Sequence, residues 1–143
     1  RSQFVAEAQS ARTFDFHGWK VGMLICYDVE FPEATRALAL AGADLIVVPT
    51  ANMADYDFVA RSLMPVRAYE NQLFVAYANF TGPEGPLQYG GLSVVAGPDG
   101  ATLAQAGREE TLLIATLDEK RLTAARKAAQ HVRDLTVLRN PAI

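Results

Sequence analysis

The chain has 143 residues, with 16 acidic and 13 basic side chains and a formal net charge of −3. Half of the residues are hydrophobic, which is enough for residues 1–143 to build one globular core. The acidic balance argues against a nucleic-acid or anionic-membrane partner, because either surface would need a basic stripe. A single cysteine excludes an intramolecular disulfide and suits a reducing cytoplasm, where we expect this protein.

The hydrophobic pattern predicts an α/β protein with a mixed sheet. Short apolar or alternating segments predict strands over residues 13–16, 19–26, 45–49, 73–78, 92–96, 101–104 and 111–117. Helical spacing predicts helices over residues 33–41, 56–70 and 119–129. Residues 19–26 are almost continuously apolar, which is typical of a strand covered on both faces. This strand, the first helix and the next strand have short links and predict a parallel βαβ unit.

Glycine and proline mark where these elements end or bend, and His17-Gly18 predicts a turn between the first two strands. Pro65 lies inside the second predicted helix and should kink it. Residues 80–91 are rich in glycine and proline and predict a loop, whereas Pro98-Asp99-Gly100 predicts a hairpin turn. Residues 118–143 are expected to form a helix and a tail. The longest apolar stretch, residues 37–48, is too short and too polar to cross a bilayer.

Cys26 is the main candidate for chemistry, because it ends a predicted strand and precedes a polar turn and a helix. In open α/β sheets, ligands bind beyond the C-terminal ends of the strands. A strand–turn–helix elbow also presents a nucleophile and offers the next backbone N–H, here that of Tyr27, as an oxyanion donor. The alternative is an inert core residue, which is common for a cysteine at the end of an apolar strand.

Neither histidine of the chain is a good partner for Cys26. His17 lies at the opposite end of the predicted strand, roughly 25–30 Å away at about 3.3 Å per residue. His131 lies in a polar C-terminal helix, where we expect it to be solvated. A general base is therefore expected to be a carboxylate or to be absent from this chain.

Several motifs together resemble one known family. Residues 21–33, VGMLICYDVEFPE, resemble the cysteine signature of the nitrilase, or carbon–nitrogen hydrolase, superfamily. Further matching segments follow in the family's order at residues 36–44, 49–52, 67–71, 78–79, 90–91 and 98–100. The resemblance covers nearly the whole chain, which corresponds to the C-terminal half of the family's domain.

The resemblance implies a four-layer αββα sandwich, of which this chain forms the C-terminal part. It implies a Glu–Lys–Cys triad without a metal or organic cofactor, a small-molecule amide substrate and a homo-oligomer. The Cys26 thiolate would attack the amide carbon, ammonia would leave, and water would cleave the thioester. The family places the glutamate and lysine upstream of the cysteine, but Glu7 and Lys20 are the only upstream residues of these types. Lys20 lies in the cysteine strand itself and does not match.

The sequence around the cysteine resembles amidases more than true nitrilases. Cys26-Tyr27-Asp28 is the amidase-like form, and residues 50–58 resemble those of bacterial amidases acting on small amides. The segment 50–58 follows a strand end and should line the pocket, with Asn52, Met53 and Tyr56 as substrate contacts. Plain packing is the alternative for Met53 and Tyr56.

Other polar residues have structural explanations. Asp28 is expected to cap the following helix or to hold the turn, and Arg67 and Glu70 should form an ordinary ion pair at i, i+3. Arg36 is most simply a solvated or interface charge. Asn79, at a strand end, either reaches the pocket or satisfies a turn.

Three alternative functions are weighed against the amidase. The missing glutamate and lysine suggest a catalytically silent fragment or an assembly module. Within the family, a nitrilase or a carbamoylase is the alternative. A nucleotide-binding domain would need a glycine-rich phosphate loop between the first strand and helix, and residues 26–32 contain no glycine.

Overall fold

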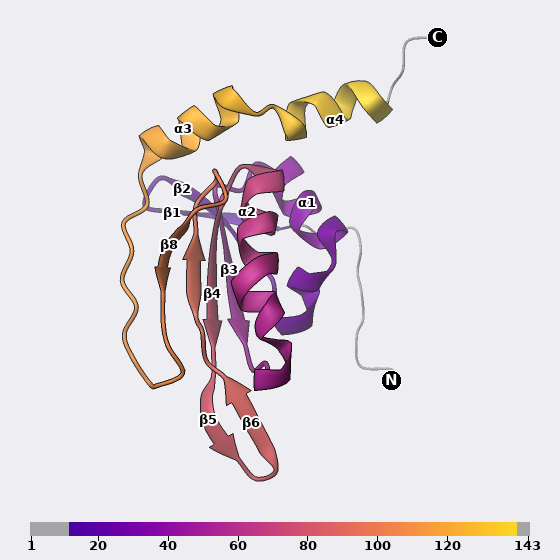
Figure 1. Ribbon diagram of the computed structural model, residues 1–143. Helices are drawn as coiled ribbons and strands as arrows, with labels where there is room; N and C mark the ends of the chain where they lie inside the picture. Colours follow the sequence, from indigo (N-terminus) through magenta and orange to yellow (C-terminus); the bar gives the residue numbers. More distant parts are fainter. Residues whose placement is uncertain (1–11, 140–143) are drawn as a thin grey trace.

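The computed structural model describes residues 12–139. A six-stranded sheet forms its centre, with α1 and α2 against one face and with α3 and α4 across one end (Figure 1). The strands are β1 (Thr13–Phe16), β2 (Trp19–Met23), β3 (Leu45–Thr50), β4 (Phe74–Asn79), β5 (Thr81–Glu84), β6 (Leu87–Gly90), β7 (Val94–Ala96) and β8 (Thr102–Gln105). The α-helices are α1 (Pro32–Leu40), α2 (Met64–Asn71), α3 (Glu119–Ala128) and α4 (His131–Arg139). Shorter helical turns are η1 (Cys26–Glu30), η2 (Ala54–Tyr56) and η3 (Val59–Leu63).

The sheet is mixed, as the sequence predicts. Its strand order is β1-β2-β3-β4-β7-β8, and β5 and β6 form a separate two-stranded hairpin. Strands β2, β3 and β4 are parallel, whereas β1, β7 and β8 are antiparallel to their neighbours. The predicted parallel β2–α1–β3 unit is confirmed. The C-terminal ends of these parallel strands therefore lie at the same end of the sheet, and β3 and β4 point toward the β5–β6 hairpin (Figure 1).

The first strand pair confirms one prediction and corrects another. His17 and Gly18 join β1 to β2 with φ of 47° and 84°, and two consecutive positive values are what a tight type I′ hairpin turn requires. The predicted strand over residues 19–26 is too long, because β2 ends at Met23. Val21 and Gly22, which point to opposite faces, are buried as predicted, but Met23 at the end of the strand is 52% exposed.

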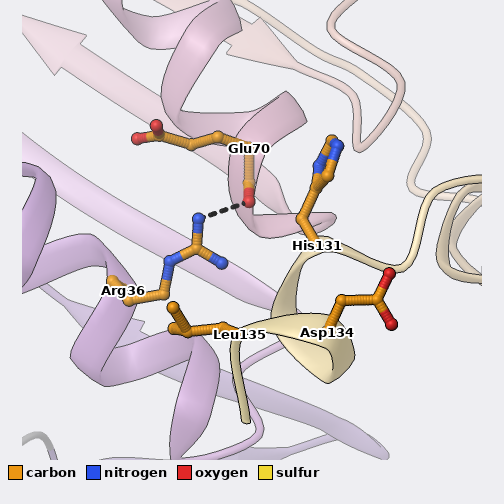
Figure 2. A pocket seen from close by; sticks show the side chains of 5 residues that line it. All are labelled: Arg36, Glu70, His131, Asp134 and Leu135. Carbon is orange, nitrogen blue, oxygen red and sulfur yellow. Dashed lines mark hydrogen bonds between the residues drawn. The ribbon is translucent and has the colours of Figure 1, made fainter. Parts of the chain in front are cut away.

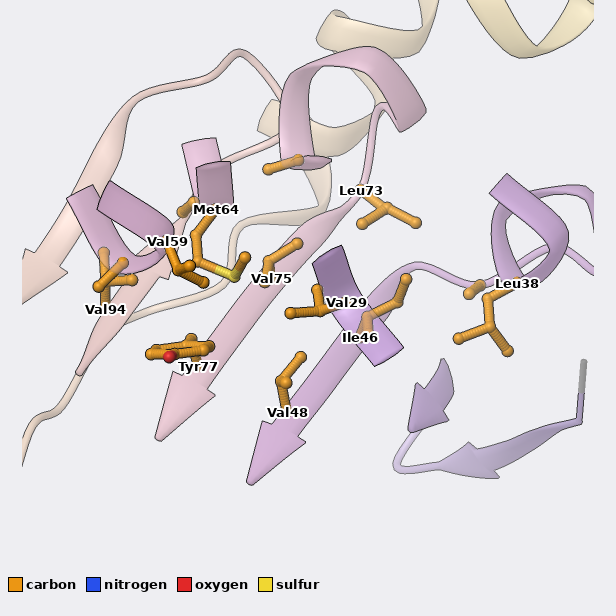
Figure 3. Packing of buried hydrophobic residues seen from close by; sticks show 14 of the residues in the cluster. Val29, Leu38, Ile46, Val48, Val59, Met64, Leu73, Val75, Tyr77 and Val94 are labelled. Atoms are coloured by element: carbon orange, nitrogen blue, oxygen red, sulfur yellow. The ribbon is translucent and has the colours of Figure 1, made fainter. Parts of the chain in front are cut away.

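The hydrophobic core lies between the sheet and the helices on one of its faces. Alternate strand residues point into it, including Ile46 and Val48 on β3 and Val75 and Tyr77 on β4 (Figure 3). They pack against helical residues such as Met64, which has no exposed surface. At about 25 cal/mol per Å² of buried apolar surface, this layer is the main stabilising contribution in the described part of the chain.

Pro65 interrupts the second predicted helix in the expected place. The chain is helical from residue 57 to residue 71, but residues 59–63 form a π-helical turn immediately before α2. Proline has no N–H to donate and clashes with the carbonyl four residues earlier, so the helix widens locally upstream of it. Gln72, with φ of 50°, then ends α2 in the left-handed conformation.

Two segments differ from the sequence prediction. The predicted loop over residues 80–91 contains the β5–β6 hairpin, which turns at Gly85 with φ of 57°. The predicted strand over residues 111–117 is wrong, because these residues pair with no neighbouring strand. Their exposure still alternates, with Leu112 83% exposed and Ile114 77% exposed. The alternation that predicted a strand is real, but a strand also needs a hydrogen-bonding partner.

The C-terminal region forms two helices instead of one helix and a tail. The Asp118 side chain accepts a hydrogen bond from the Lys120 N–H and caps α3. Arg126 fixes α3 to the starts of the central strands, donating to the carbonyl oxygens of Ala43 and Gln72 and pairing with Asp44 at 2.8 Å. No helix between residues 12 and 139 is both long enough and apolar enough to span a membrane.

Candidate active site

Cys26 lies where the chain leaves the sheet, as predicted. The Leu24 N–H still donates to the Val47 carbonyl at 3.1 Å, so pairing with β3 continues past the last residue of β2. Cys26 then has φ of 49° and begins the turn η1. A residue with a Cβ atom loses about 1–2 kcal/mol in this left-handed region, so such residues cluster at functional sites. Cys26 as a residue is partly exposed and does not belong to the buried core.

Contacts at both ends of η1 hold this conformation. Asp28 accepts a hydrogen bond from the Ile25 N–H at 3.1 Å, so Asp28 holds the turn, one of its two predicted roles. Tyr27 lies in the first turn of η1, where backbone N–H groups have no acceptor inside the helix. That position suits an oxyanion donor, a role that stays a prediction for Tyr27. Its ring is 52% exposed and meets Phe31 edge to face at 5.0 Å.

Asn79 fixes the neighbouring loop, which contains the predicted pocket residues. Its side-chain oxygen accepts from the Asn52 N–H at 2.7 Å, and its side-chain nitrogen donates to the carbonyls of Asn52 at 3.1 Å and Gly91 at 2.9 Å. Asn79 therefore satisfies a turn, one of the two roles that its sequence position allowed. Met53 forms an isolated bridge with Tyr89, which joins the loop to the β5–β6 hairpin. The third predicted contact, Tyr56, is 52% exposed.

Tyr77 is a site residue that the sequence analysis missed. It is 3% exposed, and its hydroxyl has no hydrogen-bond partner among residues 12–139. Burial raises the pKa of Tyr77 above 10.0, and the nearby charges of Cys26 and Glu30 raise the same pKa further. The side chains of Asn52 and Thr50 lie close enough to lower this pKa, although neither has hydrogen-bond geometry to the hydroxyl. A buried polar group therefore lies on β4, close to the strand ends, among otherwise apolar core residues.

The other candidate partners lie elsewhere. Lys20 lies near the start of β2, where its backbone N–H bonds to Asp44 and its side chain packs beside Gly42. His17 is in the β1–β2 turn, and His131 meets Tyr69 edge to face, with ring centroids 5.3 Å apart. Glu7 lies outside the described residues. Between residues 12 and 139, no three His, Cys, Asp or Glu side chains group closely enough to hold a metal ion.

Two hollows on the surface involve the C-terminal helices, and neither is lined by Cys26. One, of about 340 Å³, lies where α4 meets α1 and α2 (Figure 2). It contains Arg36, which donates to the Glu70 carbonyl at 2.7 Å and is half-buried. Arg36, predicted to be a solvated or interface charge, thus lies half-buried at the junction of α1 and α2. The hollow lies among helix ends, away from the strand ends that carry Cys26.

Known proteins are similar to this chain in sequence. The family model described as carbon–nitrogen hydrolase matches residues 2–127. A hydrolase of Pseudomonas protegens is 50% identical over 133 residues, which cover 93% of this chain and 47% of the relative. An (R)-stereoselective amidase of a Pseudomonas species is 41% identical, over 83% of this chain and 44% of its own length. The chain thus spans just under half the length of these relatives.

Solved structures support the fold. A double mutant of an amidase from Nesterenkonia sp. AN1, in complex with acrylamide, aligns with a TM-score of 0.78 and 40% identity, over 90% of this chain and 47% of that one. A second structure of this amidase has acrylamide added at its active-site cysteine and aligns with a TM-score of 0.73 and 44% identity, over 82% of this chain and 46% of that one. That amidase is a nitrilase-superfamily protein. The mixed sheet and its helices are accordingly part of a nitrilase fold.

Proposed function

The chain belongs to the carbon–nitrogen hydrolase family, and from this premise we propose that it contributes the nucleophile, Cys26, to an amidase acting on small amides. The observation that carries the proposal is the presentation of Cys26: a strained, partly exposed residue at the C-terminal end of a parallel strand, followed directly by a tight helical turn. The names of the similar amidases support amides as the substrate class.

The proposed reaction has two steps. The Cys26 thiolate forms a bond to the amide carbon, the carbon–nitrogen bond breaks, and the nitrogen takes a proton and leaves as ammonia. Water then attacks the thioester, which releases the carboxylic acid and restores the thiol. The Tyr27 N–H is placed to donate to the oxyanion in both steps. Asn52, Met53 and Tyr56 form one wall around the acyl group, which the β5–β6 hairpin supports through Met53 and Tyr89.

Substitution of Cys26 tests the proposal directly. In the complete gene product, Cys26→Ala is expected to abolish ammonia release from acrylamide and butyramide, because alanine has no group that can form the thioester. Circular dichroism and thermal unfolding would show that the variant is folded. Ammonia release at the wild-type rate by a folded Cys26→Ala protein would refute the assignment.

The general base and the oxyanion lysine match no residue of this chain. We therefore expect the 143-residue chain alone to hydrolyse amides at least about 100-fold more slowly than the complete gene product, since each of these groups contributes a factor of about 100 or more. Activities measured side by side on the same amides would decide this. Equal rates would mean that the residues described above suffice for catalysis.

A further inference from the structure

Arg67 makes more contacts than the ion pair that its sequence position predicts. It is 6% exposed, and its Nη1 pairs with Glu70 at 3.0 Å, as expected. Its Nε also donates to the Val29 carbonyl at 3.0 Å, and its Nη2 donates to the Glu30 carbonyl at 2.6 Å. The guanidinium of α2 is therefore bonded to two consecutive carbonyls of the turn that begins with Cys26.

These two carbonyls need an external partner. They lie at the end of η1, where helical carbonyls have no N–H group ahead of them to accept from. A guanidinium fits this pair because its donors form a planar fork, whereas the ammonium of lysine is a single point of charge. The other end of the turn is held by Asp28, which accepts from the Ile25 N–H. The strained residue between them, Cys26, is thus fixed from both sides.

Arg36, which is half-buried, shows that such contacts with the cysteine turn are not general to the arginines of this layer. Arg36 lies on α1 and also donates to a backbone carbonyl, that of Glu70, at 2.7 Å. Its acceptor is on α2, so this bond joins two helices and does not touch the turn with the cysteine. Both arginines donate to backbone carbonyls, but Arg67 bonds to the turn that begins with Cys26, whereas Arg36 joins α1 to α2.

We propose that Arg67 is the positioning residue of the nucleophile turn: by fixing the carbonyls of Val29 and Glu30, it holds Cys26 in the orientation for attack. This inference rests on the proposed role of Cys26. Arg67 does not touch the reacting atoms. Its effect is on geometry, and a misplacement of about 1 Å at a reacting group can reduce the rate by about 100-fold.

The test is the substitution Arg67→Lys in the complete gene product, with Arg36→Lys as the matched control. For Arg67→Lys we expect kcat to fall by about 100-fold, with KM within about threefold of the wild-type value. The rate of Cys26 alkylation by iodoacetamide, measured well below the unfolding temperature, should change as well, because it reports the placement of the thiol. Arg36→Lys should keep kcat and the alkylation rate within about threefold of the wild-type values, even if it lowers the thermal stability as much as Arg67→Lys does.

Glu70→Gln separates the carbonyl bonds from the ion pair. It removes the negative partner but leaves both carbonyl bonds of Arg67 possible, so kcat should stay within about threefold. A loss of kcat in Glu70→Gln equal to that in Arg67→Lys would overturn the inference and assign the effect to charge balance.

The remaining outcomes also decide whether Arg67 positions the nucleophile turn. Arg67→Lys with unchanged kcat and unchanged alkylation would overturn the proposal. If Arg67→Lys does not fold, Arg67→Gln replaces it, since glutamine can still donate to one of the two carbonyls. Failure of both to fold, while Arg36→Lys folds, would make Arg67 a stability residue and contradict the inference. Turnover by Cys26→Ala would instead refute the proposed function and leave the Arg67 geometry as it is.

Discussion

The two faces of the six-stranded sheet differ in how well the chain covers them. On the face toward α1 and α2, Ile46 and Val48 of β3 are almost completely buried (Figure 3). On the other face of the same strand, Val47 is only half-buried and Pro49 is exposed. On this second face Phe74, at the start of β4, is fully buried and packs edge to face on Trp19, with ring centroids 5.7 Å apart.

Similar apolar side chains point to both faces, so the difference does not come from composition. It comes from the second layer, which this chain supplies on one face only. The αββα sandwich that the resemblance implies would place another sheet on the second face, which fits a chain that spans just under half of its relatives. The first of the following substitutions tests this difference between the faces, and the others compare further buried and exposed positions.

The largest effect is expected from a matched pair on β3. Val48→Ala removes two methyl groups from the closed face, where Val48 is 1% exposed, and should lower the free energy of unfolding by about 2 kcal/mol. Val47→Ala makes the same change on the open face and should cost less than about 1 kcal/mol. Urea denaturation of both variants of the 143-residue chain would measure this. Equal losses would mean that the second face is covered too.

Arg126 is expected to have the next largest effect. It joins α3 to the strand starts through two carbonyls and Asp44. Because Arg126 is partly exposed, Arg126→Ala should lower the free energy of unfolding by only about 1 kcal/mol. Lys127→Ala, on the next residue of the same helix, is the control and should change it by less than about 0.5 kcal/mol. If Arg126→Ala lowered the free energy of unfolding as little as Lys127→Ala, α3 would not depend on the contacts of Arg126.

Tyr77→Phe should change stability in the opposite direction. The buried hydroxyl has no partner among the described residues, so its removal should raise the free energy of unfolding by up to about 1 kcal/mol near neutral pH. Because burial raises the pKa of Tyr77 above 10.0, the unfolded chain ionises first as the pH rises. Wild-type stability should therefore fall above about pH 10, and the phenylalanine variant should lack this part of the fall. Parallel pH profiles for the two proteins would contradict the burial of the hydroxyl.

The smallest effect is expected on the exposed segment before α3. Ile114 is 77% exposed, so Ile114→Lys should alter the free energy of unfolding by less than about 0.5 kcal/mol. Thermal unfolding would measure this, with Leu122→Lys, at a buried position of α3, as the contrast. A loss for Ile114→Lys as large as that for Leu122→Lys would show that another surface covers this segment.

The sequence predicts the parts of this structure that depend on local patterns. The β2–α1–β3 unit, the turn at His17-Gly18 and the disturbance at Pro65 all follow from periodicity and turn chemistry. The same patterns place Cys26 at a strand end. What they do not contain is the identity of the neighbouring element: residues 111–117 alternate like a strand but find no partner, and residues 81–90 pair although their composition favours a loop.

The candidate site, too, is predictable from the sequence only where it depends on local patterns. Its nucleophile candidate and its loop residues are recognisable from spacing and motif. The bonds that connect them are not, because they join residues far apart in the chain: Arg67 reaches a turn 37 and 38 residues away, and Tyr77 lies beside Asn52. At i, i+3 the spacing of Arg67 and Glu70 predicts the ion pair but not the buried carbonyl contacts. Only the packing of α2 against η1 produces them.

Labelling of the complete gene product with fluoroacetamide, followed by mass spectrometry of its peptides, is the decisive test of Cys26 as the nucleophile. A reactive thiolate can attack the fluorinated carbon of the reagent, which forms a carbon–sulfur bond to the acetamide group, breaks the carbon–fluorine bond and releases fluoride. The account predicts one such group for each chain, located on Cys26, with amide hydrolysis lost in proportion to the labelling. Full labelling of Cys26 with hydrolysis unchanged, or complete inactivation with Cys26 unmodified, would contradict it.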